Sequence, residues 1–406
     1  MKHAYNIDTT VQYTTISSLC TPLCATLKEV VKHGTYDSAY ASLHCVDDAH
    51  TQVFALAKKL KHQSYGAIFV VGIGGSNLGT QALDQALQQS TIPLYFADTM
   101  NVRMIHALQK KMVQVLHANK RVLLVLISKS GTTTETIANG SILLRVLKEH
   151  LVDYHKDVVM ITDQGSSLWE YGYEQLSIPK LVGGRYSVFS AVGMFPLLMA
   201  GYDIKQILAG ARKAQEDCIK PKNEALYRAS ILYHYYTQHI RIHDMFLFDT
   251  HLEGIGKWYR QLVGESLGKG SVGITPTVSL GTTDLHSVGQ LYLGGPLQHI
   301  TTFVSVDEHA YDYPIDGMNI LPQLQGRTLH TVLLDTLAGV KKAYEKQQRS
   351  YMHIALPRCD GWHLGYLLQM LMLETMFLGH LLGVNAFDQP HVELYKQETR
   401  KILENN

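Results

Sequence analysis

The chain has 406 residues, of which 46% are hydrophobic, and this is more apolar material than one ordinary domain core requires. Charged residues make up 17% of the chain and leave a formal net charge of +1, so no strong field attracts nucleic acid or an acidic membrane. Five cysteines without paired CxxC spacing argue against a disulfide framework and a zinc site. We expect a cytoplasmic protein of two domains that binds small molecules.

Two further features exclude common classes of protein. The first residues lack the apolar core of a signal peptide, and the long apolar stretch at residues 364–384 is interrupted by Glu374 and His380. This stretch therefore predicts a buried helix and no membrane association. The 21 histidines are scattered and form no HExxH pair, so we expect no metal.

Alternating strands and helices dominate the first half of the chain. Residues 1–50 have helical spacing in places and predict an N-terminal helical segment. A first domain is expected at residues 51–200, because apolar runs alternate there with helical patterns. The predicted strands are residues 67–71, 94–97, 122–127 and 158–162. Continuous apolar strands of this kind predict a parallel sheet that is covered on both faces.

The second half shows the same alternation. Strands are predicted at residues 245–248, 300–306 and 353–356, within a second domain at residues 201–385. The apolar spacing at residues 329–344 predicts a helix that packs into the core. Residues 386–406 predict a C-terminal helical segment that carries Lys396. The fold class is therefore α/β, with two doubly wound parallel sheets and helices on both faces.

A glycine-rich turn follows the first strand of the first domain. It contains Gly72, Gly74, Gly75, Ser76 and Gly79, and glycines let backbone amides approach an anion at the start of a helix. The dinucleotide fingerprint requires glycine where Asn77 stands, although Asp98 resembles a ribose-binding acid. A phosphate site, a tight turn without a ligand and a nicotinamide site all stay open for this motif.

A second turn is rich in hydroxyl groups and predicts a phosphate site more strongly. Six of the nine residues at 128–136 are serine or threonine, and they precede a predicted helix whose N-terminus carries positive dipole charge. No GK[ST] ending is present, so triphosphate hydrolysis is not indicated. The alternative, N-capping of the helix, needs one or two such residues, and the excess favours a ligand.

Four isolated residues have chemistry that suits catalysis. Arg185 follows two glycines and has the directed donors that stabilise an oxyanion, and Glu265 lies among small residues as a possible general base. His286 and Lys396 suit proton transfer. Taken singly, each also fits an ordinary ion pair, a solvated charge or a packed imidazole.

Together, the segments resemble the phosphoglucose isomerase family, which has two sugar-isomerase domains. The resemblance covers about residues 70–396 and rests on motifs that occur in the family's order. These motifs are VGIGGSNLG, ISKSGTTTET, GGRYSVFSAVG, GESLGK, TDLHS and FDQPHVELYK. The resemblance implies an enzyme of glycolysis and gluconeogenesis that interconverts D-glucose 6-phosphate and D-fructose 6-phosphate through a cis-enediol, without a cofactor.

The resemblance also implies a role for each catalytic candidate. Glu265 matches the base that moves a proton between two carbons, and Arg185 matches the residue that stabilises the enediolate. His286 and Lys396 match the pair that opens the sugar ring. In the family this histidine comes from the partner subunit, so the resemblance implies a homodimer.

The substrate-binding residues follow from the same resemblance. Phosphate binding is expected at Ser128, Lys129, Ser130, Thr133 and Thr136, and the sugar pocket at Gly75, Ser76, Gln261 and Gln389. The chain has His391 where the family has glycine, a residue that allows unusual backbone angles or close approach to substrate. The hypothesis is that the imidazole changes the pose of Gln389 and Lys396 and weakens activity.

Three alternatives remain. An isomerase that also accepts mannose 6-phosphate has the same motifs, and a substrate panel separates the two. A non-catalytic sugar-phosphate sensor needs the hydroxyl-rich turn but not the four catalytic candidates, and no DNA-binding motif is recognisable. A nucleotide-dependent oxidoreductase predicts a change in cofactor absorbance.

Overall fold

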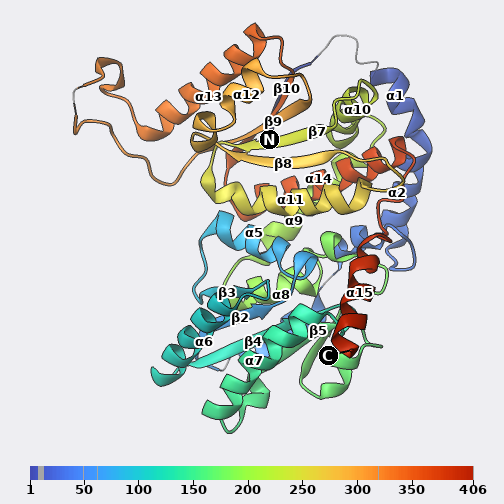
Figure 1. Cartoon of the computed structure of the whole chain (residues 1–406), viewed down its shortest axis with the longest axis vertical. Coiled ribbons are helices and arrows are strands. Elements are labelled where there is room, and N and C mark those ends of the chain that lie inside the picture. The colour runs from blue at the N-terminus through green and yellow to red at the C-terminus, as the bar shows by residue number, and fades with distance from the viewer. Residues whose placement is uncertain (8–12, 49, 62, 319, 406) are drawn as a thin grey trace. The chain divides into compact units, whose positions relative to one another are not determined.

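The structure is a computed structural model that describes residues 1–7, 13–48, 50–61, 63–318 and 320–405 (Figure 1). The strands are β1 (Lys2–Asn6), β2 (Tyr65–Val71), β3 (Leu94–Ala97), β4 (Arg121–Ile127), β5 (Val158–Thr162), β6 (Glu174–Ser177), β7 (Ile242–Leu247), β8 (Thr275–Leu280), β9 (His299–Glu308) and β10 (Tyr351–Arg358).

The helices are α1 (Tyr13–Leu19), α2 (Thr21–His33), α3 (His44–Asp47), α4 (Thr51–Leu60), α5 (Leu78–Leu87), α6 (Val102–His117), α7 (Thr134–His150), α8 (Ala191–Ala200), α9 (Ile204–Cys218), α10 (Glu224–Thr237), α11 (Glu253–Leu267), α12 (Gly289–Gly294), α13 (Leu329–Lys346), α14 (Gly361–Leu381) and α15 (Val392–Glu404). The strands alternate with helices over most of the chain, and this confirms the predicted α/β class.

One sheet has the order β3-β2-β4-β5-β6, with parallel pairing throughout. After β2 the chain builds β3 on one side and then returns to build β4, β5 and β6 on the other side. The order therefore reverses between β2 and β4, which places a switch point there. The series expected to end at residues 158–162 continues with β6, a short polar strand that apolar patterning could not reveal.

Both faces of this sheet are buried, as its continuous apolar strands predicted. Phe69 and Val71 of β2 and Leu124 of β4 belong to one core cluster with apolar residues of α6 and α7. The alternate residues, such as Val70 and Val125, are also fully buried. Both faces of the sheet are therefore covered, with α6 and α7 on one of them.

The second sheet has the order β1-β10-β9-β7-β8. It is parallel except at β1, which pairs antiparallel with β10 from Lys2↔Ala355 to Asn6↔Tyr351. The N-terminal segment thus begins with a strand where we expected helix, because pairing with a distant edge decides its conformation. Strand β8, with the sequence TPTVSL, was also missed because its threonines, serine and proline mask the apolar pattern.

The chain forms two units that are discontinuous in sequence. Unit 1 contains residues 1–25, 216–359 and 369–406, and unit 2 contains residues 26–215 and 360–368. The sheet with β2 and β4 lies in unit 2, and the sheet with β7 and β9 lies in unit 1. The expected consecutive boundaries at residues 50, 200 and 385 stay a prediction.

Helices α14 and α13 are both present where helices were predicted, but only α14 is buried to the expected extent. Helix α14 is long and apolar enough to cross a membrane, yet 83% of its apolar window is buried inside the structure, which is typical of a core helix. Helix α13 buries Leu337 and Tyr344, but its first residue, Leu329, is 59% exposed. Leu333 and Val340 are partly buried against the same core cluster, so the apolar stripe of α13 contributes to the core except at its first residue.

Candidate functional site

The carboxyl edge of the unit 2 sheet carries both predicted phosphate-binding turns. The glycine-rich turn follows β2 and the hydroxyl-rich turn follows β4, and these strands are paired neighbours, with Val71 opposite Leu126. Because ligands of doubly wound sheets bind where the strand order reverses, this crevice is the position that the topology favours for a ligand.

The hydroxyl groups of the second turn lie against one another. Ser128 Oγ is 2.9 Å from Thr133 Oγ1, and Ser130 Oγ is 3.5 Å from the same oxygen. Ser130 Oγ also accepts a hydrogen bond from the backbone N–H of Thr132 at 3.2 Å. Gly131 has a φ of +71°, which turns the backbone sharply at this point and favours glycine.

Thr136 is the most informative residue of this turn. It is 1% exposed, and its Oγ1 is buried without a hydrogen-bond partner. Thr133 is the N-cap residue of α7, yet its side chain makes no capping hydrogen bond. The N–H groups of the first helical turn therefore lack this partner, and the N-capping alternative is not what Thr133 does. The arrangement suits an anion with several acceptor oxygens.

Gly75 lacks a side chain for a reason other than the expected approach of its backbone to an anion. A Cβ atom on Gly75 would lie 2.0 Å from the backbone carbon of Gly184 and 2.5 Å from the backbone nitrogen of Arg185. Two backbone segments thus contact each other directly. Gly75 is required because it joins the glycine-rich turn to the turn that presents Arg185.

Arg185 and Lys129 are held near this contact. Arg185 is 1% exposed and its guanidinium lies 5.5 Å from the ring centre of Tyr186. Lys129 Nζ donates a hydrogen bond to the carbonyl of Val182 at 3.0 Å, and burial lowers its pKa. Lys129 therefore joins the hydroxyl-rich turn to the segment before Arg185, a role that the sequence did not indicate.

In unit 1, two candidate residues lie one helical turn apart on α11. Gln261 Nε2 donates a hydrogen bond to Glu265 Oε1 at 2.9 Å. Gln261 Oε1 is buried without a hydrogen-bond partner. The spacing of four residues brings the two side chains to one face of the helix, so Gln261 orients the carboxylate that is the candidate base.

Lys269 is a residue of the GESLGK motif for which sequence reasoning gave no role. Its Nζ forms an ion pair with Asp388 Oδ1 at 2.7 Å and also donates to the carbonyl of Asn385. These contacts fasten the segment that carries Gln389 to the end of α11. A lysine and an aspartate in two separate motifs were the available signal, but their pairing cannot be read from sequence.

The two remaining catalytic candidates lie at the surface of unit 1. His286 is exposed in a short 3₁₀ turn (Thr283–His286) that follows β8. Lys396 lies on α15, where its Nζ contacts Glu393 Oε1 at 2.7 Å. His391 has φ −73° and ψ −28°, which is helical. Any L-residue adopts these angles, so position 391 does not need the unusual backbone angles that glycine allows. That the imidazole changes the pose of Gln389 and Lys396 and weakens activity stays a prediction.

In the described part of the chain, His, Cys, Asp and Glu side chains form no group of three that could hold a metal ion. The candidate site residues predicted from the sequence are divided between the two units. Unit 2 contains the hydroxyl-rich turn, Gly75, Ser76 and Arg185, and unit 1 contains Gln261, Glu265, His286, Gln389 and Lys396.

Solved structures share this architecture. A protein of Thermus thermophilus described as hypothetical matches with a TM-score of 0.86 and 31% identity, over 98% of this chain and 100% of that one. A glucose-6-phosphate isomerase from Chlamydia trachomatis matches with a TM-score of 0.84 over 99% of this chain and 88% of that one. Its identity of 19% supports the fold alone.

Two sheets of mainly parallel strands with helices between them define a doubly wound α/β protein. Curated relatives are more particular. Glucose-6-phosphate isomerase of Thermus thermophilus is 36% identical over 349 residues, which cover 82% of this chain and 83% of that protein. A probable glucose-6-phosphate isomerase of Methanococcus maripaludis is 32% identical, with 92% and 86% covered. A family model described as phosphoglucose isomerase matches residues 56–295. The chain belongs to the phosphoglucose isomerase family.

Proposed function

We propose that this protein is a glucose-6-phosphate isomerase that interconverts D-glucose 6-phosphate and D-fructose 6-phosphate in glycolysis and gluconeogenesis. The observation that carries the proposal is the buried Thr136 hydroxyl without a partner, beside the clustered hydroxyl groups of Ser128, Ser130 and Thr133. A buried polar atom without a partner is costly unless a ligand satisfies it. A phosphate monoester has the acceptor oxygens to do so.

The proposed phosphate-binding residues are Ser128, Lys129, Ser130, Thr133 and Thr136. Lys129 acts there mainly by holding the turn, since its ammonium group is engaged with Val182. Gly75, Ser76, Gln261 and Gln389 are proposed to line the sugar pocket.

The proposed chemistry is a proton transfer through a cis-enediol. Glu265 takes the proton from the carbon next to the carbonyl group of the open-chain sugar and returns it to the neighbouring carbon. The hydrogen bond from Gln261 orients its carboxylate. Arg185 stabilises the negative charge that develops on the enediolate oxygen. His286 and Lys396 move protons between the ring oxygen and the hydroxyl group when the ring opens.

We further propose a homodimer in which His286 acts in the site of the partner. His286 is exposed in unit 1. The segment between β9 and α13 also exposes large apolar side chains, including Tyr311, Met318 and Ile320, at 66%, 72% and 73%. A cluster of this kind is typical of a surface that another protein covers.

The first experiment follows glucose 6-phosphate formation from fructose 6-phosphate, without added metal or nicotinamide, for the wild type and for Glu265→Gln. The variant keeps the shape and removes the base, so we expect a loss of kcat of about 10²- to 10⁴-fold in a folded protein. A wild type that binds the sugar phosphate without converting it would contradict the proposal and favour the sensor.

A second experiment tests the origin of His286. Glu265→Gln and His286→Ala chains are co-expressed and the mixed dimers are assayed. If each site takes Glu265 from one chain and His286 from the other, a mixed dimer contains one wild-type site, and random pairing restores about a quarter of the wild-type activity. If both residues act within one chain, no activity returns.

A further inference from the structure

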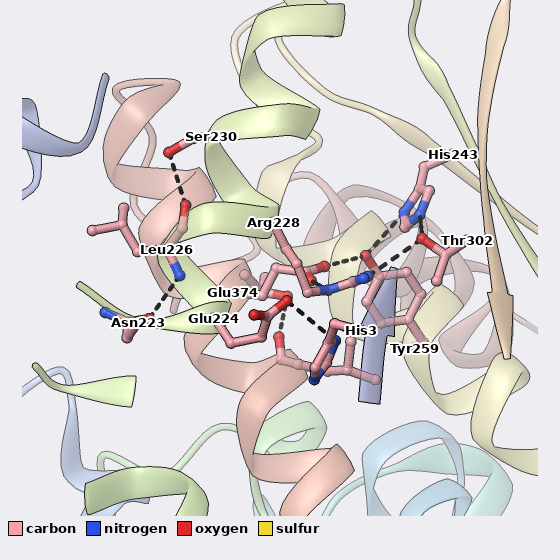
Figure 2. A network of polar contacts seen from close by, with 12 residues as sticks. His3, Asn223, Glu224, Leu226, Arg228, Ser230, His243, Tyr259, Thr302 and Glu374 are labelled. Carbon is pink, nitrogen blue, oxygen red and sulfur yellow. Dashed lines mark hydrogen bonds and ion pairs between the residues drawn. The ribbon is translucent and has the colours of Figure 1, made fainter. Parts of the chain in front are cut away.

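A buried polar network in unit 1 joins elements that are far apart in sequence (Figure 2). Its members are Arg228 of α10, His243 of β7, Tyr259 of α11, Thr302 of β9 and Glu374 of α14. Each of these residues is at most 1% exposed. Charged side chains in such a position are unusual and need complete partners, because burial of an unpaired charge is costly.

The network begins at Arg228 and ends at Glu374 along two routes. On the short route, Arg228 Nε donates directly to Glu374 Oε2 at 2.5 Å. On the long route, Arg228 Nη2 donates to Thr302 Oγ1 at 3.3 Å, and Thr302 Oγ1 lies 2.8 Å from His243 Nε2. The two routes leave the same guanidinium group in different directions.

The long route continues through the imidazole. His243 Nδ1 lies 3.0 Å from the hydroxyl group of Tyr259, and this hydroxyl donates to Glu374 Oε1 at 2.8 Å. The two carboxylate oxygens of Glu374 therefore receive the two routes separately. The five side chains form a closed ring of hydrogen bonds.

The direction of each hydrogen bond follows from the chemistry of the groups. An ionised carboxylate only accepts, so the single proton of the Tyr259 hydroxyl points to Glu374. Tyr259 must then accept from His243 Nδ1–H, which leaves His243 Nε2 as the acceptor for the Thr302 hydroxyl. This assignment requires a neutral imidazole, and burial lowers the pKa of His243 to about 3. Every hydrogen bond of the ring thus has one donor and one acceptor, while Arg228 Nη1 is buried without a hydrogen-bond partner.

Tyr259 links this ring to the helix that carries the candidate base. It lies two residues before Gln261 and six before Glu265 on α11. At about 100° per residue, Gln261 lies about 200° and Glu265 about 240° around the helix from Tyr259. The ring therefore fastens one side of α11 to β7, β9 and α14 within unit 1, while the other side presents Gln261 and Glu265.

We propose that the Arg228–Thr302–His243–Tyr259–Glu374 ring has a positioning role. It fixes the distance of α11 from the sheet and the rotation of α11 about its own axis, and thereby the position of the Glu265 carboxylate. The inference rests on the proposed function of Glu265 as the base. A displacement of about 1 Å in a reacting group lowers a catalytic rate up to about 100-fold, so the loss of one ring member affects turnover without touching substrate.

The test compares two buried tyrosines on opposite faces of the same sheet. Tyr259→Phe removes the hydroxyl group that closes the ring. The matched control is Tyr344→Phe on α13, because Tyr344 is 2% exposed and its hydroxyl lies 3.3 Å from Thr301 Oγ1, next to Thr302 on β9. Both variants are expected to lower the melting temperature.

The two variants are expected to differ in turnover on fructose 6-phosphate. Tyr259→Phe lowers kcat about tenfold or more and leaves KM within about twofold, because the base moves while the phosphate site in unit 2 is unchanged. Tyr344→Phe keeps kcat within about twofold. Equal kcat values per folded molecule for Tyr259→Phe and the wild type would overturn the proposal.

Hydrogen exchange gives a measurement that does not depend on catalysis. Amides of residues 259–267 are expected to exchange faster in Tyr259→Phe and at the wild-type rate in Tyr344→Phe. If the wild type fails to convert fructose 6-phosphate, the proposed function is wrong, and the exchange rates still decide whether the ring holds α11. Unchanged exchange in both variants would contradict the ring's role.

If Tyr259→Phe does not fold, Thr302→Val and Thr302→Ser replace it. Valine has the shape of threonine without the hydroxyl, and serine keeps the hydroxyl. The ring predicts that kcat falls in Thr302→Val and recovers in Thr302→Ser. A purely structural contribution of Thr302 lowers stability in both variants and leaves kcat unchanged, which would overturn the proposal.

Discussion

Two buried threonines of unit 2 show why a residue's burial alone does not describe its role. Thr80 and Thr136 are both 1% exposed. Thr80 Oγ1 donates to the carbonyl of Val192 at 3.3 Å, whereas Thr136 Oγ1 is buried without a partner. The first hydroxyl stabilises the fold, and we propose that the second binds the substrate phosphate.

Replacement by valine is therefore expected to change substrate affinity at Thr136 and stability at Thr80. Thr136→Val is expected to raise KM for fructose 6-phosphate about tenfold, since a hydrogen bond to a charged group contributes about 1.5–3 kcal/mol, without loss of stability. Steady-state kinetics and thermal unfolding measure both quantities. Thr80→Val is the control and should lower stability with KM unchanged. A Thr136→Val variant with wild-type KM would contradict the phosphate site.

At the scale of elements, contacts between turns decide which glycines are essential. Gly75 contacts the backbone of the Arg185 turn and admits no Cβ atom. Gly339 lies in the interior of α13, where a Cβ atom would meet no atom within 4 Å. Substitution by alanine therefore stabilises the helix at Gly339 and pushes two turns apart at Gly75.

Gly339→Ala is expected to raise the free energy of unfolding by about 0.5–1 kcal/mol, because alanine favours a helix interior over glycine. Gly75→Ala is expected to lower it by about 1–3 kcal/mol, as overpacking does, and to lower kcat because Arg185 moves. Denaturant unfolding and kinetics of the two variants check this. A stable and active Gly75→Ala protein would show that the two turns tolerate separation.

Most of the elements could be predicted from local pattern, because apolar strands that alternate with helices appear within short windows of sequence. Strands β3 and β5 were predicted at their observed bounds. Strands β1, β6 and β8 were not, because their polar or mixed sequences form strands only through pairing with a sheet edge. Of the candidate site, the motifs were found in sequence, whereas the Lys269–Asp388 pair and the role of Lys129 depend on contacts between separate segments.

At the scale of the whole molecule, several buried histidines make stability depend on pH. Burial lowers the pKa of His243 to about 3 and that of His353 to about 4. Burial also raises the pKa of Asp244 and Glu224, and a raised carboxyl pKa stabilises the folded protein as pH falls, which is the opposite direction. The histidines and these carboxyls therefore oppose each other, and removal of one histidine isolates its contribution.

The sign follows from proton binding. Below about pH 6.5 the unfolded chain binds a proton at each of these histidines and the folded protein does not, so the free energy of unfolding decreases as pH falls. The decrease is at most about 1.4 kcal/mol per pH unit for each group. We expect denaturant unfolding to show lower stability at about pH 5 than at about pH 7. His353→Gln should reduce this difference, and an equal difference in the variant would contradict the assignment.

The sequence by itself determined the α/β class, the two hydroxyl- and glycine-rich turns at carboxyl ends of strands, and the family motifs, since all of these depend on residues close together in the chain. Tertiary structure alone decided the discontinuous units, the contact of Gly75 with Gly184, and the ring around Tyr259. Arg228 and Glu374 are 146 residues apart. Hydrogen bonds between such partners form only when packing brings them together, so no local pattern encodes them.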